Sequence, residues 1–103
     1  MSWRDILLEL ISDITDPQER LDIIRTINYI LMQYENGEID YDSAKGDIAM
    51  VVRDVLMDKD PTLDEEEATQ RAIEYAERLL RKYRVRSMFR RARKRYNMLE
   101  RYK

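Results

Sequence analysis

The stretch from Asp16 to Gly37, DPQERLDIIRTINYILMQYENG, decides the fold class, because it holds one long helix between clear start and stop signals. Asp16 precedes a proline, which moves it out of the helical region and suits it to cap the helix N-terminus. Pro17 then stands in the first turn, where no amide donor is needed. Gly37 ends the helix, since glycine adopts the left-handed conformation without steric cost. We expect the apolar face of this helix to comprise Leu21, Ile24, Ile27, Tyr29, Ile30, Leu31 and Tyr34.

Two helices of similar character flank this stretch. The first should run from Ser2, its N-cap, to about Ile14, and the other should begin after its own N-cap, Asp40. The short connection over residues 36–39 predicts an antiparallel hairpin of the helices on either side of it. The expected buried residues of the outer two helices are Trp3, Ile6, Leu7, Leu10, Ile11 and Ile14, and then Ala44, Ile48, Val51, Val52, Val55 and Leu56. We also expect three methionines to be adaptable core residues: Met32, Met50 and Met57.

A fourth helix should follow Pro61, with three glutamates in its positively polarised first turn. Its inner face comprises Ala68, Ala72, Tyr75, Ala76, Leu79 and Tyr83. Continued at the same spacing, that stripe would place arginines, Arg86 and Arg90, at its next apolar positions. A second apolar stripe follows, which is offset from the first by one residue, or about 100° around a helix. The second stripe comprises Val85, Phe89, Ala92, Tyr96 and Leu99. Either the helix breaks near residues 84–87, or it continues and docks its last turns elsewhere. We favour the break, with a fifth helix from about Ser87 to Arg101.

The composition agrees with an all-α protein. Gly and Pro occur only twice each, too few for the many tight turns of a β-sandwich or barrel. A length of 103 residues suits one domain. We predict an all-α fold of four to five helices in this single domain, residues 1–103. An antiparallel helical bundle would form an acidic body over residues 1–83, and residues 84–103 would form a basic C-terminal helix.

Charge divides the chain into two parts. Residues 1–70 carry 6 basic and 18 acidic side chains, a sum of −12, whereas residues 71–103 carry 13 basic and 3 acidic ones, a sum of +10. Such an asymmetry is typical of a chain with one element that binds an oppositely charged surface. Arginine prevails in the basic part, and its planar guanidinium matches phosphate oxygens two at a time.

These features predict a non-catalytic protein that binds DNA or RNA through phosphate contacts. The expected phosphate-binding residues are Arg84, Arg86, Arg90, Arg91, Arg93, Lys94 and Arg95. Phe89 and Tyr96 either stack on unpaired bases or pack in the core. An alternative stays open, in which the basic helix of an adaptor or self-assembling subunit docks on an acidic protein partner. In a homo-oligomer that partner is the acidic body of a second copy. A basic amphipathic helix also suits an anionic membrane surface.

Other function classes find little support in the residues present. The chain has no Cys and no His, so it lacks the thiolate nucleophile and the commonest general acid–base group. Acidic segments at Asp40 and Asp58 begin like calcium-binding loops but lack the Gly and Glu that such loops need, and helix capping explains both. No apolar run approaches the ~18 residues of a membrane-spanning helix. We expect no enzymatic activity, no cofactor, no bound metal, no membrane insertion and a cytoplasmic location.

Overall fold

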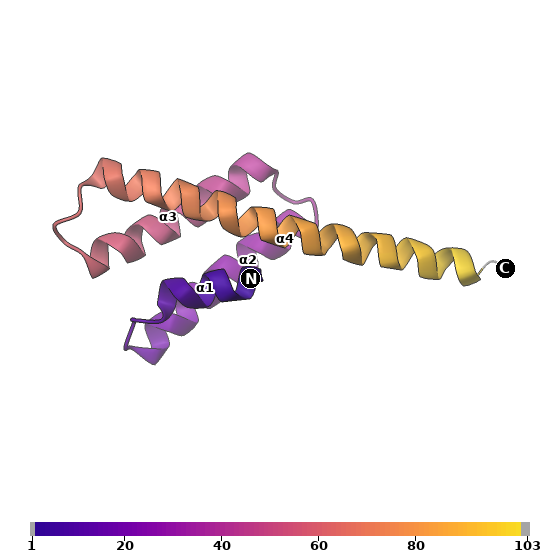
Figure 1. The fold of residues 1–103 in the computed structure, drawn as a ribbon, viewed down its shortest axis with the longest axis horizontal. Coiled ribbons are helices and arrows are strands. Elements are labelled where there is room, and N and C mark those ends of the chain that lie inside the picture. The colour runs from indigo at the N-terminus through magenta and orange to yellow at the C-terminus, as the bar shows by residue number, and fades with distance from the viewer. Residues whose placement is uncertain (1, 102–103) are drawn as a thin grey trace.

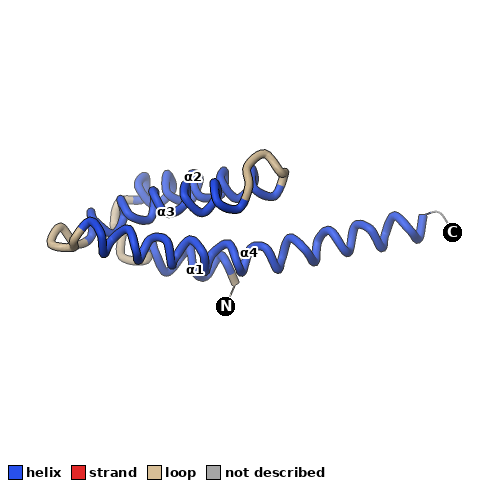
Figure 2. Tube along the Cα trace, turned by 90° about the horizontal axis from the view of Figure 1, so that it is seen from above, coloured by secondary structure: helices blue, strands red, loops and turns tan. Residues whose placement is uncertain are grey.

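The computed structural model describes the backbone of residues 2–101 and the side chains of residues 2–83. Over this part of the chain the protein is all-helical and has no strand, which confirms the predicted fold class (Figure 1). The four helices are α1 (Trp3–Ile11), α2 (Pro17–Glu35), α3 (Tyr41–Lys59) and α4 (Glu65–Arg101). We call residues 2–83 the body and residues 84–101, the last part of α4, the extension. In two perpendicular views the extension continues past the other three helices (Figures 1 and 2).

The helices begin where the capping signals predict. At the start of α1, the Ser2 hydroxyl accepts from the Asp5 amide, and the Asp5 carboxylate accepts from the Ser2 amide. This reciprocal pair is a capping box. Asp16 and Asp40 cap α2 and α3, and each accepts from a first-turn amide, at 3.0 and 2.8 Å respectively. Hydrogen bonds from backbone amides favour a charged carboxylate, so they lower the pKa of Asp5 and of Asp40.

Two helix ends differ in how well the sequence predicts them. α2 ends as expected, and Gly37 adopts a φ of +79°, the left-handed conformation. α1 was expected to reach Ile14 but ends at Ile11. The amide of Ile14 instead donates to the Ile11 carbonyl at 3.1 Å in a turn that keeps its side chain buried. The apolar spacing continues through this turn, which is why periodicity alone placed the helix end too late.

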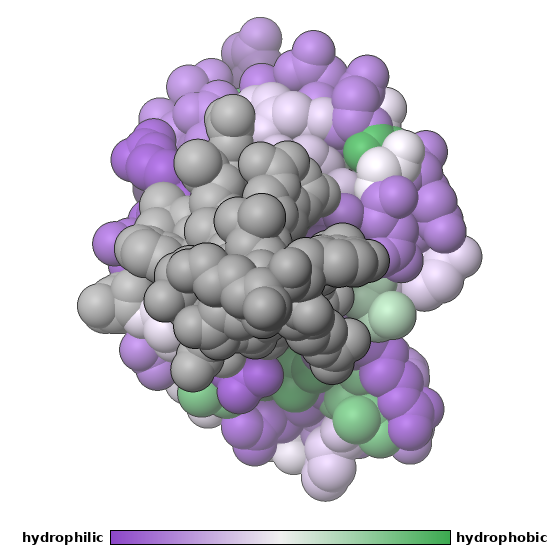
Figure 3. Space-filling view, turned by 90° about the vertical axis from the view of Figure 1, so that its right-hand side faces the viewer, coloured by the Kyte–Doolittle hydropathy of each residue, from purple (hydrophilic) through white to green (hydrophobic). Residues whose placement is uncertain are grey.

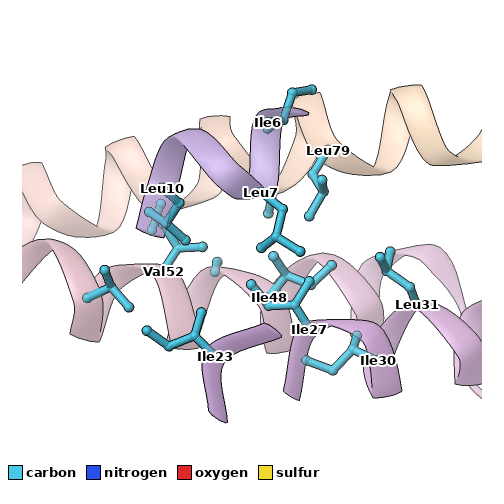
Figure 4. Packing of buried hydrophobic residues seen from close by; sticks show 14 of the residues in the cluster. Ile6, Leu7, Leu10, Ile23, Ile27, Ile30, Leu31, Ile48, Val52 and Leu79 are labelled. Atoms are coloured by element: carbon cyan, nitrogen blue, oxygen red, sulfur yellow. The ribbon is translucent and has the colours of Figure 1, made fainter. Parts of the chain in front are cut away.

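One core joins all four helices. Aliphatic side chains of the four helices point toward one another in its centre, among them Leu7 of α1, Ile27 of α2, Ile48 of α3 and Leu79 of α4 (Figure 4). α4 lies alongside α3 and contributes small fully buried residues to this contact: Ala68, Ala72 and Ala76. Small side chains let two helix backbones approach closely, so the first half of α4 is firmly part of the body.

The core differs from the expected one mainly in α2. Ile23 is buried, whereas Leu21 and Tyr29 are 39% and 62% exposed. Leu21 lies ~160° around the helix from Ile23, so one helix cannot bury both against the same neighbours. Met32 and Met50 are also exposed, at 58% and 61%, and the expectation that they fill the core is wrong. α2 carries apolar residues on two sides, and only packing selects the buried one.

The expected break in the last helix is also wrong. α4 is a single helix from Glu65 to Arg101, so no separate fifth helix follows a kink at residues 84–87. The sequence there, Arg-Val-Arg-Ser, contains neither Gly nor Pro, and nothing in it stops a helix. The change of apolar stripe therefore marks a change in which side of one continuous helix is apolar.

Candidate nucleic-acid interface

The predicted interface lies entirely on the extension. The candidate residues are Arg84, Arg86, Arg90, Arg91, Arg93, Lys94 and Arg95, together with the two aromatic residues Phe89 and Tyr96. Their side chains lie outside the residues whose side chains the structure describes. Their positions around the helix axis follow from the helical backbone, because successive residues of an α-helix are turned by ~100°.

Helix register places the apolar stripe of the extension on the side away from the body. Tyr83 is buried and marks the side of α4 that faces the body. Counted from Tyr83 at ~100° per residue, every member of the stripe lies about 160–240° around the axis. The stripe comprises Val85, Phe89, Ala92, Tyr96 and Leu99. The offset of ~100° expected from the sequence is thus too small. Leu80, which the sequence analysis did not assign to the inner face, is fully buried. Its burial widens the body-facing side of α4, so the centre of that side lies farther from the predicted stripe.

On the side of α4 marked by Tyr83, the buried residues of the body are followed by basic residues in the extension. Arg86, Arg90 and Lys94 lie within ~60° of Tyr83 around the axis. Along α4, the side that is buried in the body therefore becomes cationic in the extension, and the opposite side becomes apolar. A helix of this kind has one side suited to phosphate and another suited to an apolar surface.

Contacts with α1 and α2 fix α4 at the point where it leaves the body. The rings of Tyr83 and Trp3 pack edge to face, with centroids 5.4 Å apart and planes at 83°. The Tyr83 hydroxyl donates a hydrogen bond to the Glu35 carboxylate of α2. Arg4 lies over the Trp3 ring, with its guanidinium carbon 5.4 Å from the ring centroid. The extension consequently starts from a rigidly held residue.

The charges of the body and the extension are opposite in sign. Residues 1–83 carry 10 basic and 20 acidic side chains, a sum of −10, whereas residues 84–103 carry 9 basic and 1 acidic, a sum of +8. Several cations of the body already join helices through ion pairs. Lys59 of α3 lies 2.6 Å from Asp13 and lowers the pKa of that carboxyl, and Arg78 of α4 lies 3.5 Å from Glu9 of α1. The acidic excess of the body is therefore left to face solvent or a partner.

Two of the surface hollows in the described part of the chain lie beside α1. One, of about 340 Å³, lies between α1, α3 and α4 beside Tyr75. The Tyr75 hydroxyl donates to the Ile6 carbonyl at 2.7 Å, and burial raises its pKa, so the phenol stays protonated and acts as a structural donor. The other, of about 310 Å³, is an apolar groove between α1 and α2. It is lined by Trp3, Arg4, Leu7, Leu8, Ile24 and Asn28.

Capping accounts for one of the two acidic segments. Asp40 caps α3, whereas the Asp60 carboxylate accepts from the Thr62 amide at 3.1 Å and stabilises a turn in the loop before α4. Among the residues whose side chains are described, no three acidic side chains gather in a group that could hold a metal ion. Over the same residues, no helix has both the length and the apolar character needed to cross a membrane.

The groove between α1 and α2 is the feature that sequence reasoning missed. Its signal was present as a second row of residues on α2, one helical turn apart: Leu21, Ile24, Asn28 and Met32. The sequence interpretation assigned all of the apolar members of this row to the core.

Comparisons of the chain with known protein families, with curated proteins and with solved structures found no match.

Proposed function

We propose that this protein binds DNA or RNA without catalysing a reaction, through phosphate contacts made by the basic side of the extension. The observation that carries the proposal is the separation of charge along the chain, −10 over residues 1–83 and +8 over residues 84–103. The body, which we infer to be an antiparallel bundle, repels phosphate and leaves the extension as the contacting element. We further propose that the protein works in the cytoplasm.

The continuity of α4 supports this role. The extension has 18 residues, and at 1.5 Å per residue it spans ~27 Å, long enough to follow several successive phosphates of a nucleic acid strand. Its start is held by Tyr83 against Trp3, so the acidic body stays at one end of the binding element. Contacts of this kind give affinity with limited sequence readout, because phosphates are the same at every step.

A salt-dependent titration tests the proposal. The chain is titrated against duplex DNA, single-stranded DNA and RNA of unrelated sequences at several salt concentrations. Each phosphate neutralised on duplex DNA contributes roughly −0.9 to the slope of log affinity against log salt. Replacing Arg91, Lys94 and Arg95 with Ala should weaken binding similarly for all sequences and flatten that slope by about two to three units.

A matched control removes three cations from the body. Arg20, Arg25 and Lys45 lie on α2 and α3, and their joint replacement with Ala changes the net charge by the same amount. This variant should bind less well only to the small extent expected of a changed net charge, with nearly the wild-type slope. Absence of binding by the wild-type chain to any nucleic acid at ~50 mM salt contradicts the proposal, and so does an equal loss in both triple variants.

A second candidate function is protein–protein interaction through the same helix. The specific observation that favours it is the groove between α1 and α2, flanked by exposed apolar side chains that the body does not use for its own core. An adaptor or self-assembling subunit would give a mass that depends on protein concentration in the absence of any nucleic acid.

A further inference from the structure

The body carries an apolar surface that its own core leaves uncovered. On α1, Leu8 is 53% exposed, and on α2, Leu21 and Met32 are 39% and 58% exposed. Ile24 and Asn28 lie between them and line the groove of about 310 Å³ against α1. We call these five residues the α1–α2 face. In the view from the end where α4 leaves the body, apolar surface gathers in the lower part, at the level of α1 and α2 in Figure 1 (Figure 3).

The extension has an apolar stripe that faces away from its own body. The stripe, from Val85 to Leu99, lies about 160–240° around the axis from the buried Tyr83. The start of the extension lies next to α1, because Tyr83 contacts Trp3. The exposed α1–α2 face and the register positions of this stripe are thus two apolar surfaces that a contact with a second molecule could join.

From this pairing of surfaces we propose that the protein forms a symmetric dimer in which the extension of each copy docks its apolar stripe on the α1–α2 face of the other copy. A two-fold axis makes both contacts the same, so the exchange closes at two copies with each stripe and each face used once. This inference rests on the second candidate function, self-assembly, and does not depend on nucleic-acid binding. The cationic side of each extension, with Arg86, Arg90 and Lys94, stays on the outside of the dimer and keeps its access to phosphate.

Charge selects the body of a second copy as the partner. The extension carries most of the +8 of residues 84–103 and the body of a second copy carries −10, so their net charges attract each other even though the cationic side of the extension stays outside the contact. The stripe spacing of four and three residues also suits a coiled coil of two extensions. That arrangement would bring two strongly cationic helices together, and like charges across an interface oppose association.

The two surfaces are also of similar length. The stripe spans ~21 Å from Val85 to Leu99, and the α1–α2 face spans ~17 Å along α2 from Leu21 to Met32. The groove begins at Trp3, which contacts Tyr83, so each extension leaves its own body beside the face that receives the other extension. Phe89 and Tyr96, which the sequence left as stacking or core residues, become packing residues of the dimer interface.

The mass of the chain in solution tests the dimer. Sedimentation equilibrium of the full chain without nucleic acid should show a mass rising with concentration from 12.5 kDa toward twice that value. Replacing Leu8 and Met32 with Ser should weaken association by at least about tenfold. Replacing Phe89 and Tyr96 with Ser should do the same. The matched control is Met50→Ser on α3, which is equally exposed at 61% and should leave association unchanged.

Mixing the two double variants separates the proposed exchange from other dimers. The face variant keeps an intact extension and the extension variant keeps an intact face, so a mixed pair retains one complete contact. The mixture should therefore associate more tightly than either variant alone. Far-ultraviolet circular dichroism and thermal melting check that each variant is folded.

Three results would overturn the dimer. One is a wild-type chain that keeps the mass of one copy at all concentrations. Another is a face variant that dimerises normally while the extension variant does not, which indicates a coiled coil of two extensions. The third is a mixture that associates no better than its components. None of these outcomes bears on phosphate binding, whose failure appears separately in the nucleic-acid titration.

Discussion

The Tyr83 and Trp3 rings meet edge to face, with centroids 5.4 Å apart, at the point where α4 passes from the body into the extension. Edge-to-face pairs contribute beyond the burial of their surface, because the positive edge of one ring meets the negative face of the other. Tyr83 also binds the Glu35 carboxylate through its hydroxyl, so one side chain ties α4 to both α1 and α2. This contact sets the direction in which the extension leaves.

The hydroxyl of Tyr83 should contribute measurably to stability. Tyr83→Phe keeps the ring contact with Trp3 and removes the hydrogen bond to Glu35, and we expect a loss of about 1–2 kcal/mol in the free energy of unfolding. Denaturant unfolding followed by circular dichroism measures it. Tyr41→Phe is the control, since Tyr41 is 36% exposed and should change stability by less than about 0.5 kcal/mol. Equal effects of both changes would contradict the tie to Glu35.

The Asp16 N-cap of α2 should contribute to stability about as much as other N-caps do. Asp16→Ala removes the carboxylate that accepts from the Gln18 amide at 3.0 Å, and we expect a loss of about 1 kcal/mol in stability. Asp16→Asn keeps a side-chain acceptor at the cap and should lose only a few tenths of a kcal/mol. A denaturation midpoint that is the same for Ala, Asn and wild type would mean that this cap does not stabilise α2.

The caps were readable from the sequence because they are local. Asp16 before Pro17, and Asp40 three residues before Ser43, need no knowledge of the rest of the fold. The buried side of α2 was not readable, because Leu21, Ile23 and Met32 are all apolar and only the neighbouring helices decide which of them is covered.

The sequence likewise predicts some features of the extension and not others. Its basic character and its two stripes are plain in the sequence, but the stripes alone do not tell a break from a continuous helix. The absence of Gly and Pro at residues 84–87 was the better signal. Burial of Tyr83 and Leu80 then marks the body-facing side of α4, and the register positions of the second stripe lie opposite it, so the offset of ~100° expected from the sequence was too small.

The two glycines should respond to alanine in opposite directions. Neither has any atom within 4 Å of the position that a Cβ would take, so the added methyl group meets no neighbour. Gly37 has a φ of +79°, and Ala should cost about 1–2 kcal/mol there. Gly46 lies within α3, and Ala should stabilise the protein by about 0.5–1 kcal/mol. Thermal melts of the two single variants measure the pair, and a loss in both would show that Gly46 has a role beyond the helix backbone.

Acid should weaken the α3 cap. The amide of Ser43 holds the pKa of Asp40 below its ordinary value. A lowered folded-state pKa means that the stabilisation is complete above the ordinary pKa of ~3.9 and is lost as the pH falls through the folded value. Asp40→Asn keeps a cap that does not titrate, so its stability should fall less steeply than that of wild type below about pH 4. Urea unfolding at several pH values measures both slopes, and parallel curves would contradict the assignment.

Removal of residues 87–103 should leave a folded body. The buried side chains that the structure describes form one cluster from all four helices, and this cluster already joins them without any residue after Tyr83. The apolar stripe of the extension lies on the side of α4 away from this cluster, so its loss opens no cavity in the core.

The shortened chain loses 7 basic and 1 acidic side chains, and its net charge changes from −2 to −8. Self-repulsion of the acidic body should therefore lower its melting temperature at low salt, and added salt should recover much of the loss. A cooperative melt is the expected result, together with the loss of both phosphate binding and dimerisation. A shortened chain with no cooperative melt at any salt concentration would place Phe89, Tyr96 and Leu99 in the core of the single molecule, and the extension would then have no apolar side left to offer a second copy.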